Sequence, residues 1–195
     1  MIIGLTGRVG VGKSTACDAI CSAIDMTLID LDILGHQVLA QPKTINALTT
    51  EFGTSIVDNT GTIIRAELGR IVFSDQTKLS ALNAISHPEI KRLTHEIIAK
   101  DPSKHYLIGG ALLHEIGLLE TCDAVVLIEA DDKIVRNTIG KKAAIGDHQR
   151  SLDAYRADAT HKLINTFDQR FKQDCIALVE FILKTPTSSD YTKLI

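Results

Sequence analysis

Short apolar runs alternate with longer amphipathic stretches along this chain. That alternation is typical of strands and helices arranged around a parallel sheet. Five of the apolar runs are too short for helices and are bounded by polar or turn residues. They predict strands over residues 2–6, 27–31, 106–109, 124–129 and 162–165. The sequence therefore predicts an α/β fold of three layers, with a five-stranded parallel sheet at its centre.

Helical periodicity is clearest over residues 88–100, where apolar side chains recur on one face. Pro88 suits the first position of this helix, because its missing N–H has no intrahelical partner there. A second apolar stripe predicts a core-facing helix near the C-terminus. Its members are Phe167, Phe171, Leu178, Val179 and Ile182.

The interval between the second and third predicted strands is far longer than one crossover helix needs. We expect a single domain over residues 1–195. The nucleotide-binding core of this domain would comprise residues 1–41 and 104–195, and residues 42–103 would form a helical subdomain. The small, basic segment 140–147 lies between glycines and predicts a mobile loop within a lid at residues 137–158.

Composition narrows the classes of function. The 195 residues are 45% hydrophobic and 23% charged, with a net charge of −3 and a pI near 6.1, so no large basic field is present for nucleic acid. No segment approaches the ~20 apolar residues that span a bilayer, and no basic and apolar leader opens the sequence. The four cysteines form no CxxC pair and are interpreted as small buried thiols. We expect a soluble, cytoplasmic protein, monomeric or weakly homo-oligomeric, without nucleic-acid or membrane partners.

The strongest motif is a phosphate-binding loop (P-loop). It satisfies G-x-x-x-x-G-K-[ST] between a predicted strand and a helix-forming run. Its glycines let successive backbone N–H groups point at phosphate oxygens, and the helix N-terminus adds partial positive charge. Lys13 supplies a point charge to the β- and γ-phosphates, and the Ser14 hydroxyl is placed to ligate Mg²⁺. The expected ATP-binding residues are Gly7, Val9, Gly10, Val11, Gly12, Lys13, Ser14 and Thr15.

A P-loop does not specify the reaction. A GTPase is one alternative, because residues 58–61 contain a DxxG pattern, but N-K-x-D is absent and these residues predict a turn equally well. A motor or AAA-type ATPase would need a longer chain. A compact kinase of small molecules fits the size.

Further segments, in order, resemble the dephospho-coenzyme A kinase family. They begin with the P-loop and with Asp30, Asp32 and His36 in an I-D-x-D-x-x-x-H-x-V pattern. Residues 82–90 match L-N-x-I-x-H-P-x-I, and residues 111–115 resemble P-L-L-[FV]-E. The resemblance covers about residues 1–130. It implies a P-loop kinase that uses ATP to phosphorylate the ribose 3′-hydroxyl of dephospho-CoA.

The resemblance also implies roles for individual residues. Asp32 would orient the attacking hydroxyl and accept its proton; the alternative is that it caps a helix starting near residue 33. Asn165 would lie near the adenine. Arg136 and Lys141 would be lid cations that balance charge on the transferring group, and Mg²⁺ would be the cofactor. The acceptor site would be lined by Asp32, His36, Arg65, Asn83, His87 and Glu115.

Each of these residues also has a structural interpretation that involves no ligand. Arginine binds a pyrophosphate well through its planar fork, yet a lone Arg65 is commonly a solvated charge. His87 precedes a proline and would cap a helix, and Glu115 would lie in the first turn of another. These alternatives remain open at the level of sequence.

The chain departs from the family pattern at several positions. Arg8 stands where the P-loop usually has a second glycine, and Gly109 and Gly110 stand where an acidic residue usually follows the third strand. The lid lacks its second arginine; Lys141 or Lys142, or Arg150 and Arg156 from beyond the loop, are the replacements available. Two rivals to a dephospho-CoA kinase therefore stay open. One is a kinase of another acceptor, such as a nucleoside monophosphate, and the other is a nucleotide-binding protein without turnover.

Overall fold

The structure is a computed structural model that describes residues 1–139 and 149–185. The chain divides into two compact units. The first comprises Met1–Asp30 and Asp101–Ile195, and the second comprises Leu31–Lys100. Among the described residues, no helix combines the length and apolar character needed to cross a membrane.

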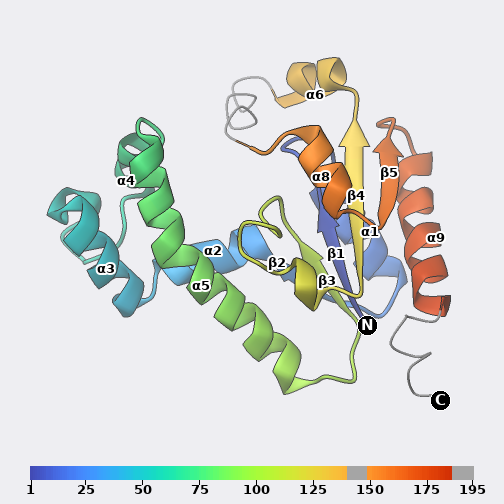
Figure 1. The fold of residues 1–195 in the computed structure, drawn as a ribbon, viewed down its shortest axis with the longest axis horizontal. Helices are drawn as coiled ribbons and strands as arrows, with labels where there is room; N and C mark the ends of the chain where they lie inside the picture. The colour runs from blue at the N-terminus through green and yellow to red at the C-terminus, as the bar shows by residue number, and fades with distance from the viewer. Residues whose placement is uncertain (140–148, 186–195) are drawn as a thin grey trace. The chain divides into compact units, whose positions relative to one another are not determined.

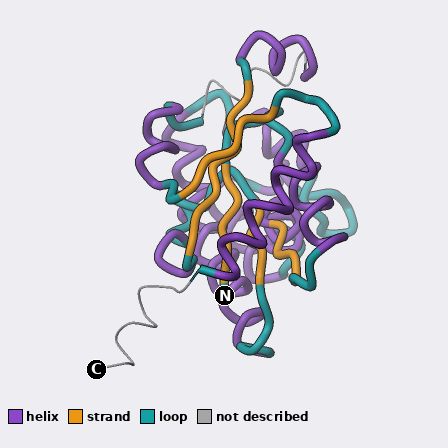
Figure 2. The backbone as a smooth tube through the Cα atoms, turned by 90° about the vertical axis from the view of Figure 1, so that its right-hand side faces the viewer, coloured by secondary structure: helices purple, strands orange, loops and turns teal. Residues whose placement is uncertain are grey.

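The first unit contains the sheet. Its strands are β1 (Ile2–Thr6), β2 (Thr27–Asp30), β3 (Tyr106–Gly109), β4 (Ala124–Ala130) and β5 (His161–Asn165). Every pairing is parallel, and the order across the sheet is β2-β3-β1-β4-β5 (Figure 1). Figure 2 shows the strands running side by side, with helices around them. The predicted α/β class, the five strands and their parallel arrangement are confirmed.

The central strand, β1, pairs with β3 on one side and with β4 on the other. Ile3 and Leu5 are completely buried, and the alternate positions, Gly4 and Thr6, are buried as well. A parallel sheet that is covered on both faces needs such near-continuous apolar strands. The carboxyl ends of all five strands meet at one edge, where ligands bind in folds of this class.

The helices of the first unit are α1 (Lys13–Ala23), α6 (Asp132–Ile139), α8 (Leu152–Asp158) and α9 (Arg170–Lys184), with a short 3₁₀ turn at Leu119–Thr121. Helices α1 and α9 pack on each other and share one apolar core with β1 and β4. Phe171, Val179 and Ile182 of α9 lie in that core, as their periodicity predicts. Phe167 was assigned to the same stripe wrongly, because α9 begins only at Arg170 and Phe167 precedes it.

The second unit is helical. It contains α2 (Leu31–Leu39), α3 (Pro42–Phe52), α4 (Arg65–Val72) and α5 (Gln76–Lys100), with a 3₁₀ turn at Thr54–Ile56. A core of its own forms around Leu48, Ile56, Ile63, Leu68 and Val72. The division into subdomains at residues 42–103 stays a prediction.

Two sequence-based predictions in this unit are wrong. Pro88 does not start a helix, because α5 runs from Gln76 through it to Lys100. Ser86, Ile90 and Thr94 are buried on both sides of Pro88, and this packing offsets the backbone bond that proline removes. Strand β2 ends at Asp30 and α2 begins at Leu31, so Asp32 lies inside a helical turn instead of capping a helix from residue 33.

The turn interpretation of residues 58–61 is supported. Gly61 N–H donates to the Asp58 carbonyl at 3.0 Å, and the Asp58 carboxylate accepts from the N–H groups of Thr60 and Thr62. These bonds lower the pKa of Asp58, with the Thr60 hydroxyl contributing most. The DxxG pattern is therefore explained by a self-contained Asx turn.

Candidate active site

The P-loop connects the end of β1 to the start of α1. Gly7 has φ +146°, and a Cβ there would lie 2.4 Å from the Ile128 carbonyl oxygen on β4. Gly12 has φ +98°, and a Cβ there would lie 2.4 Å from Asn165 Nδ2. Side chains are excluded at both positions by conformation and by space, which leaves the backbone free to curl around an anion.

Lys13 is the first residue of α1, and its ammonium group turns back over the loop. Its Nζ donates to the Gly7 carbonyl at 2.8 Å and to the Arg8 carbonyl at 2.9 Å. The positive charge is therefore held within the curl that the loop forms. Oxygens of a bound phosphate would compete with these two carbonyls for the same donor.

Ser14 and Thr15 follow in the first turn of α1, and both are exposed. No described group of three or more His, Cys, Asp or Glu side chains is arranged to hold a metal ion. Mg²⁺ in a kinase is normally held by one or two protein oxygens together with phosphate oxygens and water. The Ser14 hydroxyl is the P-loop oxygen available for that role.

Asn165 braces the loop from the end of β5. It is 4% exposed, its Nδ2 donates to the Val11 carbonyl at 2.9 Å, and its Oδ1 accepts from the Phe167 N–H at 2.7 Å. Each of its polar atoms thus has a backbone partner, as burial requires. The side chain expected near the adenine also fixes the shape of the P-loop.

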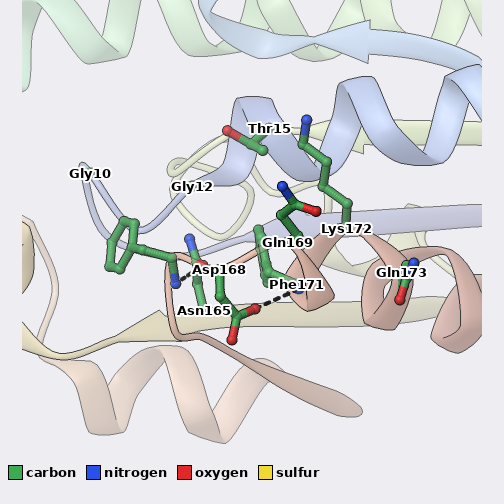
Figure 3. Close-up of a pocket in the computed structure, with 10 residues that line it drawn as sticks. Gly10, Gly12, Thr15, Asn165, Asp168, Gln169, Phe171, Lys172 and Gln173 are labelled. Atoms are coloured by element: carbon green, nitrogen blue, oxygen red, sulfur yellow. Dashed lines mark hydrogen bonds between the residues drawn. The ribbon is translucent and has the colours of Figure 1, made fainter.

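A groove of about 970 Å³ lies beside this brace. It is bordered by the loop, by α1 and by the start of α9, and Figure 3 shows its two walls facing each other. Asp168 lies in the connection from β5 to α9, and its Oδ1 accepts from the N–H groups of Arg170 and Phe171 in the first turn of that helix. The groove is lined by Gly10, Gly12, Thr15, Asn165, Phe167, Asp168, Gln169, Phe171, Lys172 and Gln173.

The end of β3 explains one departure from the family pattern. A Cβ at Gly109 would lie 2.8 Å from the Cys17 Sγ on α1, so a carboxylate has no room there. On the neighbouring strand, Asp30 pairs with Gly109 in register. Asp30 is therefore an acidic residue at the end of the strand next to Gly109. Burial of the thiol raises the pKa of Cys17 to about 12, and the charges of Cys21 and Asp30 contribute less.

A buried carboxylate ends β4. Glu129 is 8% exposed and pairs with Arg156 of α8 through two bonds, Nε to Oε1 at 2.9 Å and Nη2 to Oε2 at 2.7 Å. Hydrogen bonding from Arg156 lowers the pKa of Glu129. Lys162 Nζ lies 3.9 Å from the same carboxylate. Arg156 was considered as a lid arginine, but in this structure its guanidinium is engaged by Glu129.

Helix α8 is also tied to the segment after β3. Tyr155 OH donates to the Ala111 carbonyl at 3.0 Å, and His114 Nδ1 lies 3.0 Å from Asp158 Oδ2. Arg150, the other replacement considered, forms an ion pair with Asp158, and its Nε lies 4.0 Å from Glu115 Oε1. Burial, followed by the charge of Glu115, raises the pKa of Tyr155 to about 12. Glu115 thus faces a cluster of residues on and before α8.

Two residues, one at the start of α6 and one within the predicted lid, contact the P-loop. Arg8 Nη1 lies 3.8 Å from Asp132 Oδ1 at the start of α6, and the Val9 N–H donates to Gln149 Oε1 at 2.8 Å. Arg136 lies in the last turn of α6 and is exposed. Lys141 and Lys142 lie outside the described residues, so their part in the lid stays a prediction.

The remaining acceptor residues lie in the helical unit. Asp32 and His36 are four residues apart on α2, and Asn83 and His87 are four apart on α5, so each pair shares one helical face. His87 lies within α5, so the interpretation of it as a helix cap is wrong. Arg65 is the exposed first residue of α4. Within this unit, Asp32 thus lies near His36 on α2, and Asn83 lies near His87 on α5.

Sequence reasoning missed two features of the first unit. One is the ion pair between Glu129 and Arg156, which joins residues far apart in the chain. The other is the set of groove residues after Asn165. The polar run that follows β5 was a usable signal for the groove, because ligands bind beyond the carboxyl ends of parallel strands.

Comparisons with known proteins agree with this geometry. The family model described as "CoaE: Dephospho-CoA kinase" matches residues 1–164. The dephospho-CoA kinase of Borreliella burgdorferi is 32% identical over 139 residues, which are 71% of this chain and 67% of that protein. The dephospho-CoA kinase of Lactobacillus johnsonii is 32% identical over 176 residues, covering 84% of this chain and 88% of that protein.

Solved structures share the fold. The crystal structure of TT1252 from Thermus thermophilus has a TM-score of 0.77 at 26% identity and covers 95% of this chain and 98% of that one. Dephospho-CoA kinase from Campylobacter jejuni has a TM-score of 0.69 at 22% identity, with 93% and 96% covered. Shikimate kinase from Acinetobacter baumannii has a TM-score of 0.55 at 14% identity, with 93% and 92% covered. The two structures below 25% identity bear on the fold alone.

Proposed function

This chain belongs to the dephospho-CoA kinase family, and from that premise we propose that it transfers the γ-phosphoryl group of ATP to the ribose 3′-hydroxyl of dephospho-CoA. The chain is an ATP-dependent kinase. The observation that carries the proposal is the P-loop, in which Lys13 is held over a curl that admits no side chain at Gly7 or Gly12.

The phosphates are bound by the first unit. The backbone N–H groups of the loop and Lys13 hold the β- and γ-phosphates, and the N-terminus of α1 adds partial positive charge. Ser14 would hold Mg²⁺, and Asp30, at the carboxyl end of β2, would be a supporting acid. When bound, the ion would neutralise negative charge on the phosphate oxygens. The groove beside Asn165 receives the nucleoside.

The acceptor is bound by the helical unit. Asp32 would orient the 3′-hydroxyl and accept its proton as the bond to phosphorus forms. His36, Asn83 and His87 would position the ribose and its neighbours, and Arg65 would pair with the pyrophosphate of the acceptor. In the first unit, Glu115 is a further residue that we assign to binding the acceptor.

Charge on the transferring group would be balanced by the lid. Arg136 is the described arginine that we assign to this role, together with Lys141. Arg150 and Arg156 are assigned to holding α8 instead, because each forms an ion pair with a carboxylate. The lid would also exclude water from the reacting phosphorus.

The setting of the enzyme follows from its substrates. We propose that it works in the cytoplasm, where ATP is available and its four free cysteines would stay reduced. ATP and dephospho-CoA would be its partners, and a monomer or weak homo-oligomer is expected.

The proposal is tested by ADP release from Mg-ATP, with and without dephospho-CoA. We expect release that depends on dephospho-CoA and falls about a hundredfold or more in Lys13→Ala and Asp32→Asn, since each removes a group that acts on the transition state. Lys184→Ala and Asp25→Asn are the matched controls. Lys184 is the last residue of α9, and Asp25 lies just before the start of β2, at the other end of that strand from its carboxyl end. Neither substitution should therefore change the rate.

Absence of stimulation by dephospho-CoA, despite measured ATP binding, would contradict the acceptor assignment. A panel of nucleoside monophosphates then distinguishes the two rivals. Turnover with one of them identifies a kinase of another acceptor. ATP binding without turnover on any acceptor identifies a protein that has lost activity.

A further inference from the structure

Phe167 has a backbone conformation that its residue type disfavours. Its φ is +61°, and among the residues that the structure describes it alone has a positive φ without being glycine. The left-handed region brings Cβ close to the following carbonyl oxygen, so a bulky side chain is strained there. Such strain persists where the surrounding structure imposes it, and it gathers at ligand sites.

The strain at Phe167 is imposed by the brace on the P-loop. Asn165 Oδ1 accepts from the Phe167 N–H at 2.7 Å, while Asn165 Nδ2 donates to the Val11 carbonyl at 2.9 Å. The same buried amide therefore fixes the phosphate loop and the backbone that carries the aromatic ring. Two hydrogen bonds through Asn165 therefore connect the backbone of Phe167 to the P-loop.

Core packing does not account for this ring. Phe167 is 39% exposed, whereas the nearby Phe171 is 3% exposed and contributes the apolar contact beneath Gly12. Phe167 instead lines the groove that opens beside Gly10 and Gly12. A partly exposed aromatic ring at the wall of a groove next to the P-loop is suited to the flat face of a base.

We propose that Phe167 is a nucleotide-binding residue whose ring stacks on the purine base of ATP. This inference rests on the proposed function, because it takes the triphosphate to lie in the P-loop. The groove adjoins that loop at Gly10, Gly12 and Thr15, so a base joined to those phosphates enters it directly. Stacking by one aromatic side chain changes base affinity by about 5- to 150-fold when the ring is removed.

The test measures dissociation constants for ATP and for inorganic tripolyphosphate by calorimetry. Phe167→Ala and Phe167→Gly should each weaken ATP binding about tenfold or more, and Phe167→Tyr should bind like the wild type. Tripolyphosphate has no base, so its affinity should be the same in all four proteins. Phe181→Ala is the control, because Phe181 is 60% exposed on α9 and does not line the groove.

A second readout isolates the strain. Alanine and glycine both remove the ring, but only glycine accepts φ +61° without strain. Phe167→Gly should therefore melt about 2–4 °C above Phe167→Ala. The control pair at Phe181 should show the reverse order, because glycine inside α9 destabilises the helix relative to alanine.

Each contrary result has a distinct meaning. Unchanged ATP affinity in Phe167→Ala would overturn the proposal, and so would equal losses for ATP and tripolyphosphate, which would indicate damage to the loop. A Phe167→Gly protein that melts below Phe167→Ala would overturn the assignment of strain. Wild-type protein that binds neither ATP nor tripolyphosphate would instead overturn the proposed function.

Discussion

Gly109→Ala tests why β3 carries no side chain at the edge where nucleotide is expected to bind. The added Cβ would lie 2.8 Å from the Cys17 Sγ and 3.7 Å from Leu28 Cδ1. Cys17 is 6% exposed and belongs to the core that α1 shares with the sheet. Because packing there is dense, the Cys17 side chain, the helix or the strand has to shift to admit the methyl group.

The expected magnitude combines two opposing effects. Replacing glycine by alanine in a strand normally stabilises a protein by about 0.5–1 kcal/mol, through the lower entropy of the unfolded chain. Overpacking a core costs about 1–3 kcal/mol. We therefore expect a net loss of about 1–2 kcal/mol, which is about 2–8 °C in melting temperature for a chain of this size.

The assay is urea and thermal unfolding of Gly109→Ala, Cys17→Ala and the double variant. Removing the sulfur makes room for the methyl group, so the double variant should lose less stability than the two single changes added together. Gly35→Ala is the matched control. A Cβ there meets only Ile90 Cδ1 at 3.8 Å, an ordinary contact, and the change should stabilise α2.

Two results would refute the reasoning. If Gly109→Ala is as stable as the wild type, the sulfur has simply rotated away and space does not exclude a side chain at this position. If the two single changes are strictly additive, the loss arises elsewhere than at the contact between Gly109 and Cys17.

Three further outcomes are expected. Arg156→Met should melt at a lower temperature than the wild type at pH 7. Because Arg156 lowers the pKa of Glu129 from its ordinary 4.5, the stability that this ion pair contributes is complete above pH 4.5 and is lost as pH falls through the lowered pKa. The difference in melting temperature should therefore shrink in acid, and a constant difference would contradict the pairing. Tyr155→Phe should cost about 1 kcal/mol in urea unfolding by removing the bond to the Ala111 carbonyl, and an unchanged midpoint would contradict that bond. Burial raises the pKa of Cys17 to about 12, so this thiol should resist alkylation at pH 8 in the native protein and react after unfolding. Mass spectrometry detects the alkylated residue, and rapid labelling of the native protein would contradict the burial of Cys17.

Several parts of this protein follow from local sequence. The P-loop is determined locally, since its glycines, its lysine and the strand and helix around it are contiguous. The five strands are also visible in sequence, because a covered parallel sheet needs short continuous apolar runs. The resemblance to a kinase family rests on ordered motifs that survive in the first 130 residues or so. These features identified the class of fold and the family.

Other features depend on residues that meet only in the folded chain. Pro88 lies inside α5 because buried residues on both sides of it outweigh its local preference to start a helix. Gly109 lacks a carboxylate because Cys17, distant in sequence, fills that space. Glu129 meets Arg156, and Asn165 meets Val11, only after β4 and β5 are placed beside β1.

The physical reason for this division is the range of the interactions. Hydrophobic periodicity and turn chemistry act over a few residues, so they can be detected in the sequence. Contacts that exclude a side chain, engage a guanidinium or hold Phe167 at positive φ depend on the packing of distant segments. Local sequence therefore determined where the P-loop lies, and tertiary structure decided which side chains surround it.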